Sequence, residues 1–290
     1  MLNYKNIFLS ALLLLIANLL FAGGGWPQPK NHGYFKLSQW WVVSNQHFTD
    51  TGMIDPNVTT GTFNTSIYAE YGFTDRLTGI VYFPFFSRVY SNNIVSGTTG
   101  KVIVPGDAVN SIGDTDISLK YGLIVDKPVV LSATLTLGLP FGESAGGSQG
   151  NLQTGDGEFN QMLTFDAGTG FNIGKVSAYS NAYFGFNQRN GGYSDEWRFG
   201  IEAGANLFKN KITAIMRLYG VRSLQNGTRN DDDNAGTSFF ANNSEHLSIS
   251  PEIAYNFNEN WGASFTYASA LSGKLIFADP SYSVGVFFKF

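Results

Sequence analysis

The chain alternates apolar and polar residues with a period of two over most of its length, and this pattern restricts its fold more than any other feature. In VVLSATLTLGL (residues 129–139), an apolar residue at every second position alternates with Ser132, Thr134, Thr136 and Gly138. The stretches DTDISLKYGL (114–123) and EWRFGIEAGANLF (196–208) repeat the pattern. Successive side chains of a strand point to opposite faces, so each segment has one apolar and one polar face. Such segments of roughly ten residues are typical of a transmembrane β-barrel, whose apolar face meets lipid.

Short turns and long polar connections alternate between these segments. The short turns are residues 73–77, 125–128, 172–175, 208–211 and 258–261. The long connections are residues 46–61, 91–111, 141–157, 188–195, 225–243 and 272–280. Bacterial outer-membrane barrels combine short periplasmic turns with long external loops. A β-sandwich would also show period-two strands, but it does not predict this regular asymmetry.

The segments predict about twelve strands, an even number as such barrels require. They are residues 33–45, 62–73, 77–90, 112–124, 128–140, 158–171, 175–188, 196–208, 211–224, 244–257, 260–271 and 281–290. The last one, SYSVGVFFKF, must pair with the first because an open sheet edge cannot exist in lipid. We therefore predict an all-β fold, a transmembrane antiparallel β-barrel over residues 33–290. Its final residue, Phe290, resembles the terminal aromatic that the barrel-assembly machinery recognises.

The N-terminal 22 residues have the layout of a signal peptide. One charge, Lys5, precedes an apolar run over residues 7–21, and Ala22 is followed by three glycines. This pattern predicts export with cleavage after Ala22, and a membrane anchor is the alternative. Residues 23–32 then form either a periplasmic tail or a plug that folds back into the lumen. An export signal together with the barrel pattern predicts that the protein lies in the outer membrane of a Gram-negative bacterium, where outer-membrane lipid surrounds it.

Composition excludes several classes of protein. Charged residues make up only 14% of the chain, which has 25 Phe, 34 Gly and a formal net charge of −4. This composition suits strands that face something other than water, and it does not suit a nucleic-acid partner. The chain has no Cys, so it holds neither a disulfide framework nor a thiolate metal site.

Aromatic residues mark the predicted turns. Those beside the short turns are Tyr71, Phe73, Tyr121, Phe171, Tyr255, Phe257, Trp261 and Phe290. This placement predicts a girdle of aromatic side chains at the periplasmic interface of the membrane.

Three stretches resemble a known family. GDTDISLKYGL (113–123) resembles the Gly-Asp-rich strand of the outer-membrane family named for the meta-pathway of phenol degradation. YGFTDRLTGIVYFPFF (71–86) resembles that family's early hairpin, including the mid-strand Pro84, and QTGDGEFNQ (153–161) resembles a theme of related exported proteins. The resemblance implies a channel or transporter for small, often aromatic or hydrophobic compounds. These motifs are structural, so they assign no substrate-binding residue.

The polar face of the strands supplies the candidate functional residues. Alternation places these candidates in the lumen: Lys36, Glu70, Asp116, Lys120, Asp166, Arg198, Glu202, Arg217, Glu252, Tyr183 and Tyr219. Arg217 is expected between Glu202 on the preceding strand and Glu252 on the following one. Such charges can form a constriction that selects solutes, or can simply brace and fill the barrel. The inward tyrosines suit an amphipathic ligand or space filling equally.

An enzyme is the weakest alternative. His246 and Ser248 form a His-x-Ser pair, a spacing that outer-membrane lipases and lipid A deacylases use. Alternation turns this pair into the lumen, away from lipid, so we expect no catalytic residues. His32 and His47 have no partners at ligand spacing, and Asp231, Asp232 and Asp233 indicate a solvated loop rather than a calcium site. We therefore expect neither a metal nor a cofactor.

The sequence thus predicts a non-enzymatic outer-membrane channel or transporter for small solutes, with hydrophobic or aromatic solutes as candidates. The first alternative is a closed structural barrel whose long external loops serve adhesion or surface assembly. An outer-membrane lipid hydrolase is the third.

Overall fold

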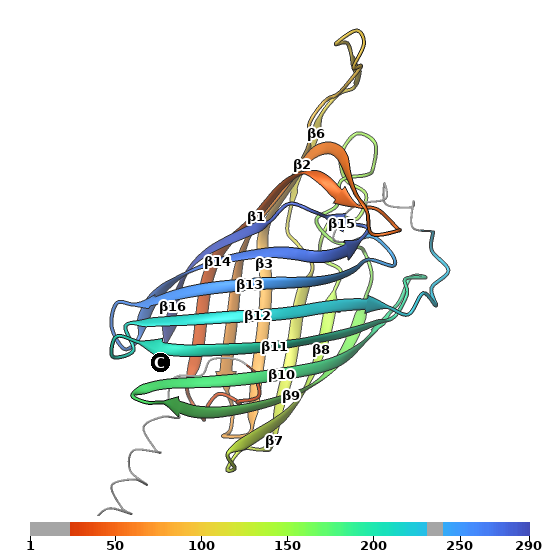
Figure 1. The fold of residues 1–290 in the computed structure, drawn as a ribbon. Helices are drawn as coiled ribbons and strands as arrows, with labels where there is room; N and C mark the ends of the chain where they lie inside the picture. Colours follow the sequence, from red (N-terminus) through yellow and green to blue (C-terminus); the bar gives the residue numbers. More distant parts are fainter. Residues whose placement is uncertain (1–23, 231–239) are drawn as a thin grey trace, which may run out of the picture.

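A computed structural model describes residues 24–230 and 240–290, whose strands form a closed antiparallel β-barrel (Figure 1). Twelve strands of the described residues make the wall: β1 (Gly33–Phe48), β2 (Ile54–Gly72), β3 (Leu77–Ser91), β7 (Thr115–Ile124), β8 (Val129–Leu139), β9 (Asn160–Ile173), β10 (Val176–Arg189), β11 (Glu196–Leu207), β12 (Ile212–Ser223), β13 (Glu245–Asn256), β14 (Trp261–Lys274) and β16 (Ser281–Lys289). The predicted fold and strand number are confirmed. The predicted signal peptide lies outside the described residues. In the part of the chain that is described, no helix is long and apolar enough to cross a membrane.

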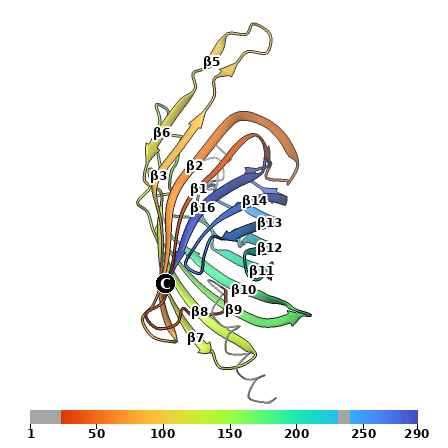
Figure 2. The same ribbon diagram turned by 90° about the vertical axis from the view of Figure 1, so that its left-hand side faces the viewer.

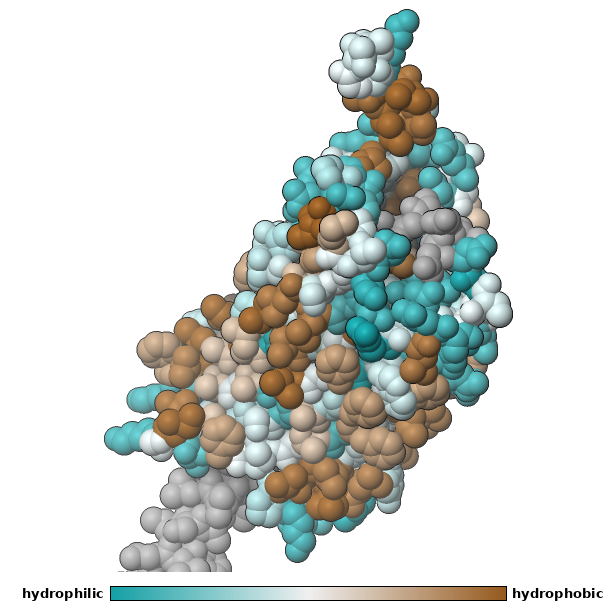
Figure 3. Space-filling view, turned by 45° about the vertical axis from the view of Figure 1, so that its right-hand side comes forward, coloured by the Kyte–Doolittle hydropathy of each residue, from teal (hydrophilic) through white to brown (hydrophobic). Residues whose placement is uncertain are grey.

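The two faces of each strand differ as the alternation predicts. On β8, Leu135 is 47% exposed on the outside, whereas the next residue, Thr136, is only 7% exposed and points inward. Ser118 on β7 and Thr136 share a hydrogen bond of 2.8 Å inside the barrel. Figure 3 shows apolar side chains gathered over the lower wall, with polar ones prominent toward the opposite end. This apolar belt is the surface that lipid covers.

The barrel closes where the last strand meets the first. β16 pairs with β14 on one side and with β1 on the other, and β1 pairs with β2. Beyond the end of β16, Phe290 and Gly33 exchange backbone hydrogen bonds of 3.0 and 3.1 Å. A side chain at position 33 would lie 2.6 Å from the Phe290 ring, so only glycine admits the terminal aromatic there. The twelve wall strands of the described residues thereby form a closed ring, as lipid requires.

Aromatic side chains gather at the end of the barrel with short turns. Tyr71 packs edge-on against Phe73 at 5.3 Å and lies 6.4 Å from Phe290. Tyr255 packs against Phe257 at 5.7 Å beside the turn between β13 and β14. Aromatic side chains therefore gather where the sequence predicts the periplasmic girdle.

Three predicted external loops contain strands, which corrects the sequence interpretation. Only residues 49–53 separate β1 from β2, although we expected a loop over 46–61. Within residues 91–111, β4 (Ile94–Val95) and β5 (Val102–Val104) form a hairpin that projects beyond the barrel, and β6 (Asp107–Ser111) extends the pairing of β3 (Figure 2). β15 (Ile276–Phe277) pairs with the end of β1. The long connections as a whole are rich in polar and turn-forming residues, which is why they indicate loops. The short strands β4, β5 and β15 within them consist of Ile, Val and Phe, residues that favour strands when a neighbouring segment is available for pairing.

Candidate functional site: the barrel lumen

A cluster of charged side chains crosses the lumen around Arg217. The Arg217 guanidinium on β12 donates to Glu202 on β11 and, over 2.6 Å, to Glu252 on β13. Lys36 on β1 donates to the other oxygen of Glu252 over 3.3 Å. The hydroxyl of Tyr179 on β10 donates to Glu202 over 2.6 Å. Two carboxylates and two cations therefore neutralise each other, and with Tyr179 they form a network that joins five strands.

Glu70 is the centre of a second polar cluster, on the wall formed by β2. Glu70 is only 1% exposed, and its carboxylate accepts hydrogen bonds from the Tyr68 hydroxyl and, over 2.7 Å, from the side-chain amide of Gln28. The Tyr34 ring packs edge-on against Tyr68 at 6.2 Å and stacks on Phe287 at 5.7 Å. A buried carboxylate is thus held among aromatic rings, which is stable because its oxygens are hydrogen-bonded.

The segment that precedes β1 contacts the interior of the wall far from β1. The backbone amide of Gly25 donates to the Asn181 side chain on β10 over 2.8 Å, and the backbone amide of Gln28 donates to the Thr78 hydroxyl on β3 over 2.8 Å. Lys120 on β7 donates to the Gly24 carbonyl over 2.6 Å. The Trp26 ring lies against the backbone of β9 at Gly168, where a Cβ would be 2.6 Å from the ring. Residues 24–28 therefore reach inward across the end of the barrel that carries the short turns.

At least two cavities lined by the described residues lie in the lumen, one nearer the short turns (the lower cavity) and one nearer the long loops (the upper cavity). The lower one, about 380 Å³, is lined by both polar clusters and by Tyr34, Lys289 and Gly24. The upper one, about 310 Å³, is lined by Trp40, Asn64, Pro84 and Asp114 among others. Tyr82 on β3 lines both cavities. The two cavities therefore follow each other along the barrel, with Tyr82 between them.

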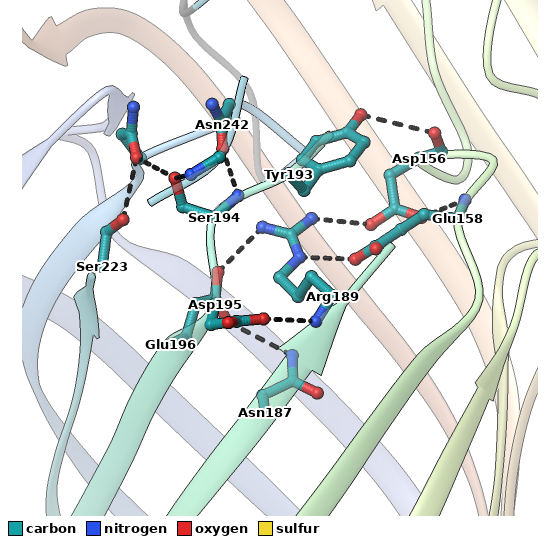
Figure 4. Close-up of polar contacts among 12 residues, drawn as sticks. Asp156, Glu158, Asn187, Arg189, Tyr193, Ser194, Asp195, Glu196, Ser223 and Asn242 are labelled. Atoms are coloured by element: carbon teal, nitrogen blue, oxygen red, sulfur yellow. Dashed lines mark hydrogen bonds and ion pairs between the residues drawn. The ribbon is translucent and has the colours of Figure 1, made fainter. Parts of the chain in front are cut away.

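A buried ion-pair network ties the external loops together around Arg189 (Figure 4). The Arg189 side chain, at the end of β10, is only 6% exposed. It donates to Glu158, to Asp156 over 3.0 Å and to Glu196 at the start of β11 over 2.9 Å. The Tyr193 ring lies 4.3 Å from the Arg189 guanidinium carbon. One cation thereby holds the loop over residues 140–159 against the next external connection.

Two carboxyl groups of this external region have raised pKa values. Burial raises the pKa of Glu158 to about 7, against the opposing influence of the Arg189 cation. Burial and the nearby charge of Asp156 raise the pKa of Asp114 to about 7. Asp114 nevertheless accepts hydrogen bonds from the backbone amides of Gly142 (2.9 Å) and Asp156 (2.8 Å). The loop over residues 140–159 is therefore anchored to a carboxyl group that changes charge near neutral pH.

The remaining sequence candidates lie on the lumen wall outside the Arg217 cluster. Asp166 on β9 is in register with Tyr183 on β10, whose ring covers Gly200 on β11. Asp116 on β7 is in register with Tyr82. Arg198 donates to Glu196 over 2.9 Å, and Tyr219 packs edge-on against His246 at 5.7 Å. The structure thus brings together Lys36, Glu202, Arg217 and Glu252, and distributes the others along the wall.

The His246–Ser248 pair forms a hydrogen bond inside the barrel. The Ser248 hydroxyl lies 3.0 Å from His246 Nδ1, and Ser248 is buried on the lumen side of β13. The pair therefore does not face the lipid that an outer-membrane lipase would attack. Within residues 24–230 and 240–290, no group of three or more His, Asp or Glu side chains is arranged to hold a metal ion.

Sequence reasoning did not find three features of this site. It did not single out Arg189, because the partners of an arginine at a loop boundary depend on how the loops fold. It did not pair Lys36 with Glu252, since β1 and β13 are not neighbours in the wall. It left the path of residues 24–32 open. The glycines at 24 and 25, which fit against Asn181 and the β9 backbone, are a local signal of a close approach.

Comparisons with known proteins support the fold. No family model and no curated protein sequence matches the chain. Among solved structures, the COG4313 outer membrane channel from Pseudomonas putida F1 matches 93% of this chain and all of its own, with a TM-score of 0.57 and 12% identity. The β domain of the Bordetella autotransporter BrkA matches 90% of this chain and all of its own, with a TM-score of 0.51 and 11% identity. The NanC porin matches 88% of this chain with a TM-score of 0.48 and 8% identity.

The COG4313 channel and the BrkA β domain share the outer-membrane barrel architecture with this chain. At such low identity the likeness concerns the fold, and the apolar belt and aromatic girdle are independent observations on this chain that agree with it. The chain has the fold of the outer-membrane β-barrels of Gram-negative bacteria.

Proposed function

We propose that this barrel is a channel that passes small solutes across the outer membrane. The observation that carries the proposal is the pair of lumen cavities, which lie on either side of Tyr82 and are lined by charged and hydroxyl-bearing side chains. A barrel that served only as a scaffold would gain more stability from a filled interior than from a hollow one. The Arg217 cluster is then the polar constriction through which a solute passes.

The lining favours small amphipathic solutes, including aromatic ones. Tyr34, Tyr68 and Tyr179 place aromatic rings around the lower cavity, and the polar clusters lie beside them. Rings of this kind contact flat apolar groups, while the nearby carboxylates and cations orient polar groups. The resemblance of residues 71–86 and 113–123 to the meta-pathway phenol family supports the same solute class.

Residues 23–32 are proposed as a plug that narrows the periplasmic mouth. The described part of this segment is hydrogen-bonded to β3, β7 and β10, on different sides of the barrel. Further contacts include the hydrogen bonds of the Lys30 backbone amide to Asp75 (3.0 Å) and of the Asn31 backbone amide to Gly72 (2.8 Å), and the edge-on packing of Trp26 against Tyr179 at 6.1 Å. These contacts are separate from the strand pairings of the wall, so the segment can open while the wall stays folded.

The projecting hairpin favours surface assembly as a second function. β4 and β5 extend beyond the barrel at the external end (Figure 2), and their aliphatic side chains are exposed, with Ile103 at 65% and Val95 at 53%. Exposed apolar residues gathered on one element are a feature of interaction surfaces. A closed barrel that presents this hairpin to another protein is therefore the alternative. Catalysis is not proposed, since the His246–Ser248 pair faces the lumen.

Single-channel recording in planar bilayers tests the proposal. Wild-type protein should conduct, and Arg217→Ala should be more cation-selective, because it leaves Glu202 and Glu252 without their shared cation. Trp26→Ala should raise the conductance by loosening the plug. Arg76→Ala is the matched control, since Arg76 lies in an exposed periplasmic turn and pairs with Asp126. If every variant is silent at all voltages, the open channel is refuted and the hairpin-based alternative leads.

A further inference from the structure

A shallow, open groove of about 420 Å³ lies on the outer face of β1, β2 and β3 near the external end of the barrel. It is lined by Gln39, Phe63, Phe86, Arg88 and Tyr90. The rings of Phe63 and Tyr90 are stacked at 6.2 Å, with an angle of 21° between their planes. The Tyr90 ring lies flat against the wall over β2, because a Cβ at Gly61 would be only 2.1 Å from it. The floor of this groove is therefore aromatic and apolar.

A β-bulge in β3 is the reason that a cation faces this groove. The pairing of β2 with β3 shifts register between Thr65 and Ile67, opposite the stretch of β3 that contains Pro84. Before the shift, Tyr82 points into the lumen; after it, Ser87 and Val89 are buried inside. Without the bulge, the alternation that directs Tyr82 inward would also direct Arg88 inward. Bulges commonly re-aim side chains in this way.

The height of Arg88 places it at the external edge of the membrane. Leu77, the first residue of β3, is in register with Tyr121 of the predicted periplasmic girdle. Arg88 lies 88 − 77 = 11 residues further along β3. At roughly 3.3 Å per residue and a strand tilt of about 40°, this separation corresponds to about 28 Å of height. The apolar band of such barrels is about 25 Å tall, so Arg88 lies at the level of the external lipid headgroups.

Arg88 has the charge and the free donors to bind an anion there. Its Nη1 donates to Asn110 on β6 over 2.9 Å, and no carboxylate of the described residues lies within ion-pair distance of it. The guanidinium has five N–H donors in a planar fork that matches a phosphate group. An arginine in an interfacial aromatic girdle would explain the charge and the rings at this height. The bulge that turns Arg88 outward beside the stacked rings of Phe63 and Tyr90 additionally places this cation at the edge of a hollow.

We propose that this groove binds a phosphorylated lipid of the external leaflet, of the acylated and phosphorylated disaccharide type that lipid A represents. Arg88 binds the phosphate, and Phe63, Phe86 and Tyr90 contact the sugar and the first carbons of an acyl chain. The external leaflet is the source of this ligand because the groove opens to the lipid side of the wall, and the lumen lies on the other side of the strands.

Native mass spectrometry of the purified, delipidated barrel with bisphosphorylated lipid A tests this site. Wild-type protein should retain the lipid, and Arg88→Gln should bind it about tenfold more weakly, which is the effect expected for loss of one charge-assisted contact. Phe63→Ala, which leaves the cation in place, should also weaken binding. Arg76→Gln in the periplasmic turn should bind as the wild type does. Dephosphorylated lipid A should bind the wild type as weakly as bisphosphorylated lipid A binds Arg88→Gln.

Two results would overturn the site. One is equal retention of lipid A by wild type and Arg88→Gln, both shown to be folded by heat-modifiable gel mobility. The other is loss of bound lipid A when millimolar inorganic phosphate is added, since that would show a free-anion site rather than a lipid site.

Discussion

A single arginine should have opposite consequences at two adjacent positions of β12. Met216 is 47% exposed on the lipid side, whereas Ile215 lines the lower lumen cavity. Met216 lies four residues from Ile212, where β12 begins. At about 3.3 Å per residue and roughly 40° of tilt, that distance is about 10 Å above the periplasmic turn, close to the middle of an apolar band about 25 Å tall. Met216→Arg therefore exposes a charge to the centre of the bilayer.

The expected cost of Met216→Arg is about 2–4 kcal/mol of folding free energy, which lowers the folded-to-unfolded ratio roughly 30-fold to nearly 1000-fold. Ile215→Arg should cost much less, because its guanidinium would enter a hollow, polar space and lie opposite Glu252, with which position 215 is in register. The assay is reversible guanidinium unfolding in lipid vesicles, followed by tryptophan fluorescence and heat-modifiable gel mobility. Equal losses for the two variants, or a larger loss for Ile215→Arg, would refute the assignment of these faces.

Three further outcomes are expected. Arg189→Met should destabilise the external region by about 3–5 kcal/mol, because it leaves Asp156, Glu158 and Glu196 buried without their shared cation. Limited proteolysis should then cut faster within residues 140–159, whereas the control variant Arg222→Met should remain resistant. The folded-state pKa values of Glu158 and Asp114 are raised to about 7. Their contribution to stability is therefore complete below the unfolded pKa values and is lost as pH rises through about 7. The loop over residues 140–159 should accordingly resist protease better at pH 5 than at pH 8, and Asp114→Asn should reduce this pH dependence. Phe290→Ala should slow assembly into the outer membrane, measured by pulse-labelling, because the terminal ring packs on Phe35 and Phe288 at the closing seam; unchanged assembly kinetics would contradict a recognition role for this residue.

Much of the wall was predictable because its determinants are local. A strand that separates lipid from a polar lumen must alternate with a period of two, so β8 and β11 can be recognised from their own residues. Short turns such as residues 125–128 mark the strand ends on one side. The partners of Arg217 were predictable for the same reason: Glu202 and Glu252 lie on the strands next to it in sequence, and antiparallel neighbours connected by turns keep a definite register.

The sequence by itself therefore determined the barrel, its strand order and the two faces of its wall. Only the tertiary structure decided which side chains from distant parts of the chain pair with each other. Lys36 pairs with Glu252, and Arg189 pairs with Glu158 of the external loop. It also decided that residues 24–28 turn inward and that a bulge beside Pro84 turns Arg88 outward. The physical reason is that a local pattern specifies the period of a strand, whereas a register shift or a contact across the lumen depends on how distant strands are brought together when the sheet closes.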